Sequence, residues 1–168
     1  MRIGIDIDET LVETEKSFKR IVNKYNLDIK CEYRNIWTKE EFKILSPFFT
    51  ELLGNVELKE YAKEVIDELN RLGHELYVIT ARCNKYALGI EEKTLDLLNR
   101  NNLKFKEIYF GQNKKSDLAK KLKIDLMIDD NINVYNNMKK ENIDCILFGD
   151  KINNWKGVLK YIERKNNG

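Results

Sequence analysis

The sequence predicts an α/β fold: a Rossmann-like, doubly wound parallel sheet of five main strands in the order 3-2-1-4-5, with a small helical cap inserted after strand one. Two observations support this fold class. From residue 57 onward, short apolar stretches alternate with amphipathic helical stretches, which is typical of parallel strands joined by crossover helices. Before residue 57 the helical pattern is longer than one crossover needs. We therefore expect an α/β core at residues 1–12 and 57–168 and a helical cap at residues 13–56.

The first strand is predicted at residues 2–8, where three isoleucines alternate with small or acidic residues. Apolar residues at helical spacing then predict a helix over 11–25. After a loop, Thr38 and Glu41 form a capping-box pattern that starts another helix. Pro47 should split that helix after Ser46, so the cap is expected to be mostly helical.

The rest of the chain alternates regularly between the two kinds of element. A strongly periodic helix is expected over 57–72, ended by a glycine. The remaining strands are predicted at 74–80, 107–110, 125–129 and 143–148, and the remaining helices at 86–101, 116–122, 131–141 and 155–162. This alternation is the basis of the predicted parallel sheet.

Composition limits the function. The chain has 168 residues, 30 of them Lys or Arg and 28 Asp or Glu, with a formal net charge of +2. This near balance argues against a nucleic acid or a membrane surface as a partner. The three cysteines lack metal-ligand spacing, and neither a signal peptide nor a long apolar run is present. We expect a soluble, cytoplasmic protein, and the sequence leaves its oligomeric state open.

Polar residues gather where three predicted strands end: Asp6 and Asp8 after the first, Thr80 and Arg82 after the second, Asp129 and Asp130 after the fourth. The carboxyl ends of parallel strands share one edge of the sheet, where open α/β folds bind ligands. Carboxylates that meet there repel one another unless a cation compensates. A set of oxygen ligands without histidine or cysteine favours Mg²⁺ over Zn²⁺.

Such a site is suited to phosphoryl transfer. A carboxylate can attack phosphorus and form an aspartyl-phosphate, while Mg²⁺ and a lysine neutralise the phosphoryl oxygens. A second carboxylate two residues along the chain can protonate the leaving group and then deprotonate water.

Four segments resemble the ordered motifs of the haloacid dehalogenase-like (HAD) phosphatase superfamily: Asp6-Ile7-Asp8-Glu9-Thr10, Ile79-Thr80-Ala81-Arg82, Lys115-Ser116 and Ile128-Asp129-Asp130. Cap position and chain length look most like the 5′(3′)-deoxyribonucleotidase branch and its small bacterial relatives. Glu9 departs from the glycine that many members have at its position. The resemblance implies a Mg²⁺-dependent phosphomonoesterase acting on a small phosphate ester, with (deoxy)nucleoside monophosphates as the expected substrates of a 5′-nucleotidase.

The resemblance also implies residue roles. Asp6 would be the nucleophile and a metal ligand, and Asp8 the general acid/base and a metal ligand through its backbone carbonyl. Thr80 and Lys115 would bind the phosphoryl group, and Asp129 would hold Mg²⁺.

Several assignments stay open. Arg82 fits either substrate phosphate or a neighbouring carboxylate. Asp130 fits either support of the metal or the cap of the following helix. Lys114 competes with Lys115 as the motif lysine. Cap aromatics could stack on a nucleobase or form the core of the cap. Of these aromatics, Trp37 is the first candidate for substrate contact and Phe18 the second.

Other functions remain as alternatives. The same chemistry would serve another small phosphate ester, such as a sugar phosphate, or a polynucleotide 3′-phosphate. A phospho-receiver signalling domain uses similar residues, but its phosphorylated Asp follows a middle strand, where this chain has Phe110-Gly111-Gln112. A dinucleotide-binding dehydrogenase is excluded because no GxGxxG follows the first strand.

Overall fold

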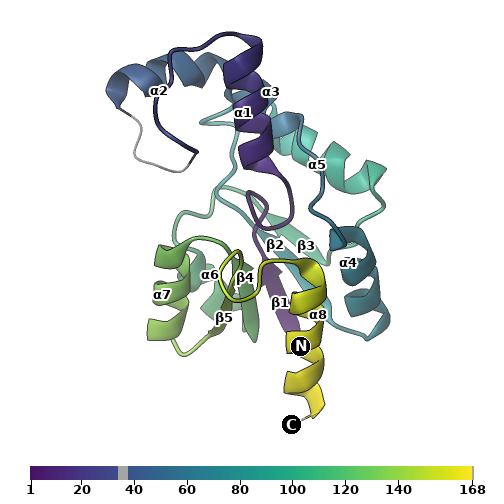
Figure 1. The fold of residues 1–168 in the computed structure, drawn as a ribbon. Coiled ribbons are helices and arrows are strands. Elements are labelled where there is room, and N and C mark those ends of the chain that lie inside the picture. Colours follow the sequence, from purple (N-terminus) through teal and green to yellow (C-terminus); the bar gives the residue numbers. More distant parts are fainter. Residues whose placement is uncertain (34–37, 168) are drawn as a thin grey trace.

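In a computed structural model of the chain, which describes residues 1–33 and 38–167, one parallel sheet forms the centre of the molecule (Figure 1). Within these residues it has five strands in the order β3-β2-β1-β4-β5, all parallel, which confirms the predicted topology. The strands are β1 (Arg2–Ile5), β2 (Glu75–Ile79), β3 (Glu107–Tyr109), β4 (Leu126–Asp129) and β5 (Asp144–Leu147).

Helices cover both faces of the sheet, as Figure 1 shows. On one face lie α4 (Ala62–Arg71) and α8 (Trp155–Asn167), and on the other lie α6 (Lys115–Leu122) and α7 (Ile132–Lys140). Helix α5 (Ile90–Arg100) joins β2 to β3. Within the described parts of the chain, no helix combines the length and the apolar character that a membrane span requires.

The remaining helices sit beyond the carboxyl ends of the strands, at the end of the molecule opposite to both termini (Figure 1). They are α1 (Thr14–Lys24), α2 (Lys39–Leu45), the 3₁₀ helix η1 (Ser46–Phe48) and α3 (Phe49–Gly54). We call residues 14–33 and 38–54 the helical insertion. The capping box between Thr38 and Glu41 is present, and the helix changes to 3₁₀ at Ser46, next to Pro47, as predicted. The predicted domain boundaries stay a prediction.

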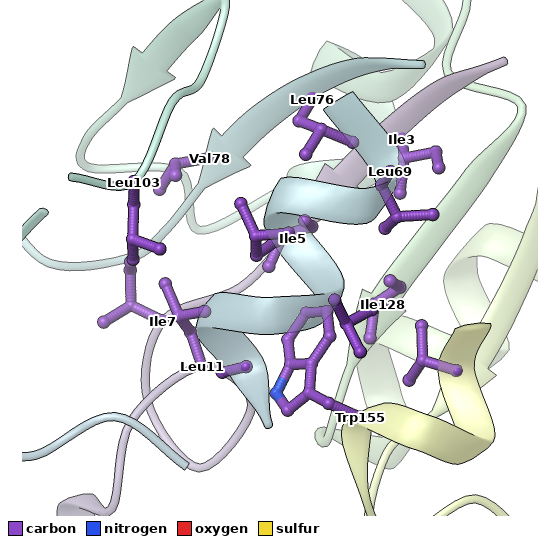
Figure 2. Close-up of a cluster of buried hydrophobic side chains, with 14 of the residues drawn as sticks. Ile3, Ile5, Ile7, Leu11, Leu69, Leu76, Val78, Leu103, Ile128 and Trp155 are labelled. Carbon is purple, nitrogen blue, oxygen red and sulfur yellow. The ribbon is translucent and has the colours of Figure 1, made fainter. Parts of the chain in front are cut away.

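The main apolar core lies between the sheet and α4, α5 and α8. Alternate residues of each strand point into it, such as Ile3 and Ile5 of β1 and Leu76 and Val78 of β2, as expected from the alternation of side chains along a strand. Figure 2 shows Leu69 of α4 beside Ile3, and Trp155 of α8 beside Ile128. Trp155 is fully buried, and its indole N–H donates a hydrogen bond to the Thr10 carbonyl at 3.0 Å. The core thus supports the turn that follows β1.

Three helices begin later than their apolar patterns predicted. The helix predicted from 57 begins at Ala62, because Tyr61 before it has a left-handed backbone (φ 61°). The helix predicted from 86 begins at Ile90, after Gly89 in the same region (φ 76°). The helix predicted from 11 begins at Thr14, since the preceding residues pair with residues 57–59. Leu11 and Val12, which precede α1, are buried in the core, whereas Tyr86 and Leu88, which precede α5, are exposed.

Candidate active site

Three carboxylates meet at the carboxyl edge of the sheet. Asp6 follows β1, Asp129 ends β4, and Asp130 comes next in the chain. One oxygen from each lies within 4.8 Å of the others. Asp6 and Asp129 are buried, and Asp130 is partly exposed. Neighbouring parallel strands bring these side chains together, as their positions in the sequence predicted.

Lys115 joins two of these carboxylates. Its Nζ lies 2.5 Å from Asp6 Oδ1 and 2.7 Å from Asp129 Oδ2, and its side chain is 6% exposed. Lys115 is the first residue of α6, whereas Lys114 at the N-cap is exposed. Of the two candidates, the structure therefore brings Lys115 to the acidic residues.

Burial dominates the proton affinity of Asp6. The pKa of this carboxyl is raised from 3.8 to about 7: burial is the largest cause, Lys115 lowers the pKa, and the neighbouring Asp129 and Asp8 raise it. Burial alone would lower the pKa of Lys115, but its two carboxylate partners raise it. The ammonium therefore stays charged and stabilises negative charge at this edge of the sheet.

Asp8 lies beside this cluster and is held by donors from two directions. Thr14, the first residue of α1, donates its hydroxyl to Asp8 Oδ1 at 2.7 Å. Arg82 donates from Nε to Oδ2 at 3.0 Å and from Nη2 to Oδ1 at 2.7 Å. Of the two alternatives for Arg82, the structure shows the bond to a carboxylate. Contact between Arg82 and a substrate stays a prediction.

Thr80 is buried at the end of β2, next to the end of β1. Its hydroxyl oxygen accepts a hydrogen bond from the backbone N–H of Arg82 at 3.2 Å. Within the part of the chain that the structure describes, its hydroxyl proton has no acceptor, so it remains able to bind a phosphoryl oxygen.

The turn after Asp8 explains how the chain accommodates Glu9 at a backbone position that favours glycine. Glu9 has φ 56°, in the left-handed region that favours glycine. Its side chain accepts hydrogen bonds from the backbone N–H of Glu15 at 2.6 Å and from Lys59 at 3.2 Å. These contacts offset the backbone strain and fix the start of α1.

Asp130 does not cap the helix that follows it. Asn131 is the N-cap of α7 and accepts a hydrogen bond from the Asn133 N–H. Asp130 instead accepts from the Thr10 hydroxyl at 3.4 Å and faces the acidic cluster. The helix-cap interpretation is therefore wrong, and the alternative of metal support fits the geometry.

A pocket of about 240 Å³ opens between the helical insertion and the sheet. Asp8 and Arg82 form part of its wall, and the rest is mostly apolar and aromatic: Tyr33, Phe49, Leu52, Leu53, Ala81, Cys83, Tyr86, Ala87 and Ile90. Phe18 is not in this wall, because it is buried among the helices of the insertion with its ring 5.6 Å from that of Tyr33. Trp37 lies outside the described residues.

A second hollow of about 680 Å³ lies around Asp130, Glu9 and Lys59. The two hollows thus have different acidic residues in their walls, Asp8 in the smaller and Asp130 in the larger.

The three carboxylates fit a magnesium ion. Asp6, Asp129 and Asp130 offer oxygen atoms, which Mg²⁺ prefers. One lysine only partly offsets their charge, so a divalent cation would be stabilised among them.

Sequence reasoning missed the groups that hold the Asp8 carboxylate. Thr14 and Thr94 belong to no motif. The motif that contains Arg82 does not indicate that its side chain is buried. A threonine six residues after an acidic motif gives no sign of its contact, and arginine is rarely buried. Sequence reasoning also did not single out Tyr86 as a pocket residue, because it was placed in a predicted helix.

Comparisons of sequence point to nucleotidases. No family model matches the chain. A Bacillus cereus protein named "Putative nucleotidase" is 31% identical over 96 residues, a match that spans 49% of this chain and 51% of that protein. An Oceanobacillus iheyensis protein named "Putative nucleotidase OB0422" is 25% identical over 97% of this chain and 95% of its own length. The similarity therefore includes one relative over its whole length.

Comparisons of structure point to HAD hydrolases. A HAD-superfamily hydrolase from Ehrlichia chaffeensis superposes with a TM-score of 0.59 and 14% identity, over 97% of this chain and 96% of that one. A β-phosphoglucomutase from Clostridium difficile has a TM-score of 0.63 and 13% identity, over 99% and 96%. These findings confirm the family resemblance predicted from the motifs: the chain has the α/β fold of the HAD superfamily, and its sequence is similar to that of proteins named as nucleotidases.

Proposed function

We propose that the protein is a Mg²⁺-dependent phosphomonoesterase that works through an aspartyl-phosphate. The observation that carries this proposal is the contact of Lys115 with both Asp6 and Asp129 at the edge of the sheet, beside Asp8. This arrangement supplies a nucleophile, a cation for the phosphoryl oxygens and a second acid within one site.

The residues divide the reaction into two steps. In the first, Asp6 Oδ attacks phosphorus, the bond from phosphorus to the ester oxygen breaks, and Asp8 gives its proton to the leaving oxygen. In the second, water attacks phosphorus and passes a proton to Asp8, while the bond to Asp6 breaks and inorganic phosphate leaves.

The remaining groups stabilise charge. Lys115 and Thr80 bind phosphoryl oxygens. Asp6, Asp129, Asp130 and the Asp8 carbonyl would hold Mg²⁺, which would supply further positive charge against the phosphoryl oxygens.

We infer that the substrate is a nucleoside monophosphate or a phosphate ester of similar size. The 240 Å³ pocket has Asp8, the proton donor to the leaving oxygen, in its wall, so it suits the leaving group. Its volume is below the roughly 300–1,000 Å³ of sites for drug-sized ligands, which favours a leaving group no larger than a nucleoside. Tyr33, Phe49 and Tyr86 offer aromatic surface for a base.

Sugar phosphates are the second candidate. The neighbour named as a β-phosphoglucomutase supports this alternative, while the scarcity of polar side chains in the pocket wall favours a flat aromatic group over a sugar.

Hydrolysis of nucleoside monophosphates, sugar phosphates and a 3′-phosphorylated oligonucleotide, measured side by side as phosphate release with Mg²⁺, tests the proposal. Asp6→Asn should abolish turnover, whereas Asp28→Asn, at an exposed acid outside the site, should not change it. Turnover by Asp6→Asn at the wild-type rate would overturn the mechanism.

The base-binding pocket has its own test. Tyr86→Ala should raise KM for a nucleoside monophosphate about tenfold, because stacking on one aromatic ring is worth about 1–3 kcal/mol. The KM for acetyl phosphate, whose leaving group has no ring, should stay unchanged. An equal rise for both substrates would contradict the assignment of the pocket.

A further inference from the structure

Arg82 is buried, and its contacts leave its guanidinium little freedom. Its side chain is 1% exposed. Nη1 donates to the Thr94 hydroxyl on α5 at 3.0 Å, and that hydroxyl donates to the Ile90 carbonyl at 2.7 Å. Because the Thr94 hydroxyl donates its proton to the Ile90 carbonyl, a lone pair of the hydroxyl oxygen faces Arg82. The hydroxyl is therefore an oriented acceptor for Nη1.

The backbone around Arg82 is equally constrained. Its N–H donates to the Thr80 hydroxyl at 3.2 Å, and its carbonyl accepts from the Gly111 N–H at 2.8 Å. Main chain and side chain are thus both anchored, so the two donors that reach Asp8 are presented from a rigid support.

Those two donors match the two oxygens of Asp8. Nε and Nη2 each bond to a different oxygen, at 3.0 and 2.7 Å. This two-point contact fixes the plane of the carboxylate as well as its position, which a single ammonium could not do. Both oxygens of Asp8 accept hydrogen bonds in this contact, which fits the deprotonated carboxylate.

We propose that Arg82 is a positioning residue that orients the Asp8 carboxylate to take a proton from water during breakdown of the aspartyl-phosphate. This inference rests on the proposed function and gives a role to the carboxylate contact, one of the two alternatives that the sequence left open for Arg82. In this step the water oxygen bonds to phosphorus, its proton passes to an oxygen of Asp8, and the electron pair of the broken bond returns to Asp6.

The two steps can be separated with an activated ester. The leaving group of para-nitrophenyl phosphate departs without a proton, so formation of the aspartyl-phosphate from it does not need Asp8 as an acid. Breakdown by water still needs Asp8 as a base. A defect in the orientation of Asp8 should therefore slow the second step alone.

The test is rapid-mixing kinetics of para-nitrophenyl phosphate with Mg²⁺. Arg82→Met should release a burst of para-nitrophenol equal to the enzyme concentration, followed by turnover roughly 100-fold slower than wild type, within the usual contribution of a general base. Acid-quenched samples should contain the aspartyl-phosphate. In an Asp8→Asn background, Arg82→Met should slow breakdown no further, because the two residues act as a unit.

Matched variants keep the outcome interpretable. Arg71→Met makes the same change at an exposed arginine paired with Glu68 and should behave as wild type. If Arg82→Met fails to fold, Thr94→Val removes the anchor of Arg82 with little change in shape and should give a smaller defect in the same step.

Other outcomes overturn specific parts. Equal slowing of burst and steady state, or further slowing in the Asp8→Asn background, would show that Arg82 binds the phosphoryl group or only supports the fold, and would overturn this inference alone. Absence of phosphoenzyme in every variant, or wild-type turnover by Asp6→Asn, would overturn the proposed function and this inference with it.

Discussion

Replacement of Asp6 should show how much the burial of this carboxylate lowers the free energy of unfolding. Its pKa is raised from 3.8 to about 7 in the folded protein, with burial as the largest cause. The folded state therefore binds a proton more tightly than the unfolded chain, so without metal the free energy of unfolding should fall as pH rises from about 4 to about 7. The whole difference in pKa corresponds to about 4 kcal/mol at alkaline pH.

Asp6→Asn removes this charge and keeps the shape of the side chain. It also weakens the bond from Lys115, so we expect it to stabilise the metal-free protein at pH 8 by somewhat less than about 4 kcal/mol. At pH 5 the wild-type carboxyl is mostly protonated in the folded state. The advantage of the variant should therefore shrink by about 3 kcal/mol between pH 8 and pH 5.

Urea denaturation with a chelator, at both pH values, measures this difference. Asp28→Asn is the control, because it removes an exposed acid. Added Mg²⁺ should reverse the order at pH 8, since the wild type has all three carboxylates to bind it. This prediction would be refuted if Asp6→Asn were less stable than wild type at both pH values, or if its gain in stability did not depend on pH. Either result would show that the buried Asp6 charge does not destabilise the metal-free fold.

Three further changes test the supports of the site. Glu9→Gly should be more stable than Glu9→Ala by about 1 kcal/mol in urea denaturation, because both lose the contact with Lys59 but only glycine relieves the left-handed backbone; equal stabilities would show that this turn carries no strain. Trp155→Phe should lower the free energy of unfolding by about 2–3 kcal/mol, since it leaves the Thr10 carbonyl without its buried donor and creates a cavity; a loss below about 0.5 kcal/mol would show that the bond is replaced. Burial tends to raise the pKa of Asp144, but hydrogen bonds from two lysines and a tyrosine hold this pKa at about 2. These bonds should therefore stabilise the fold above about pH 4 and be lost as pH falls towards 2. Asp144→Asn should lower the melting temperature at pH 7 and have little effect near pH 2, whereas an equal effect at both pH values would contradict this linkage.

The sequence was sufficient for the sheet because its signals are local. Apolar runs end in Asp, Thr or Gly, and alternation of strands with helices leaves few topologies. That Asp6 and Asp129 meet follows from parallel strands sharing an edge, so the acidic cluster was predictable without coordinates.

The helix starts and the support of Asp8 could not be predicted in the same way. Tyr61 takes a left-handed conformation although tyrosine has no preference for it, so the pattern extended the helix too far. The burial of Arg82 depends on Thr94, which is distant in the sequence and belongs to no motif. Such contacts arise from tertiary packing, which the order of residues does not show.

The chain enters and leaves the helical insertion at the same place. Val12 and Leu58 form an antiparallel bridge, and the Glu13 N–H donates to the Glu57 carbonyl at 2.9 Å. Because the two ends are already paired, the segment between them can change in length or be exchanged without moving the strands that carry Asp6 and Asp129. In evolutionary terms, the part of the 240 Å³ pocket wall that the insertion contributes (Tyr33, Phe49, Leu52 and Leu53) can vary separately from the acidic residues at the edge of the sheet.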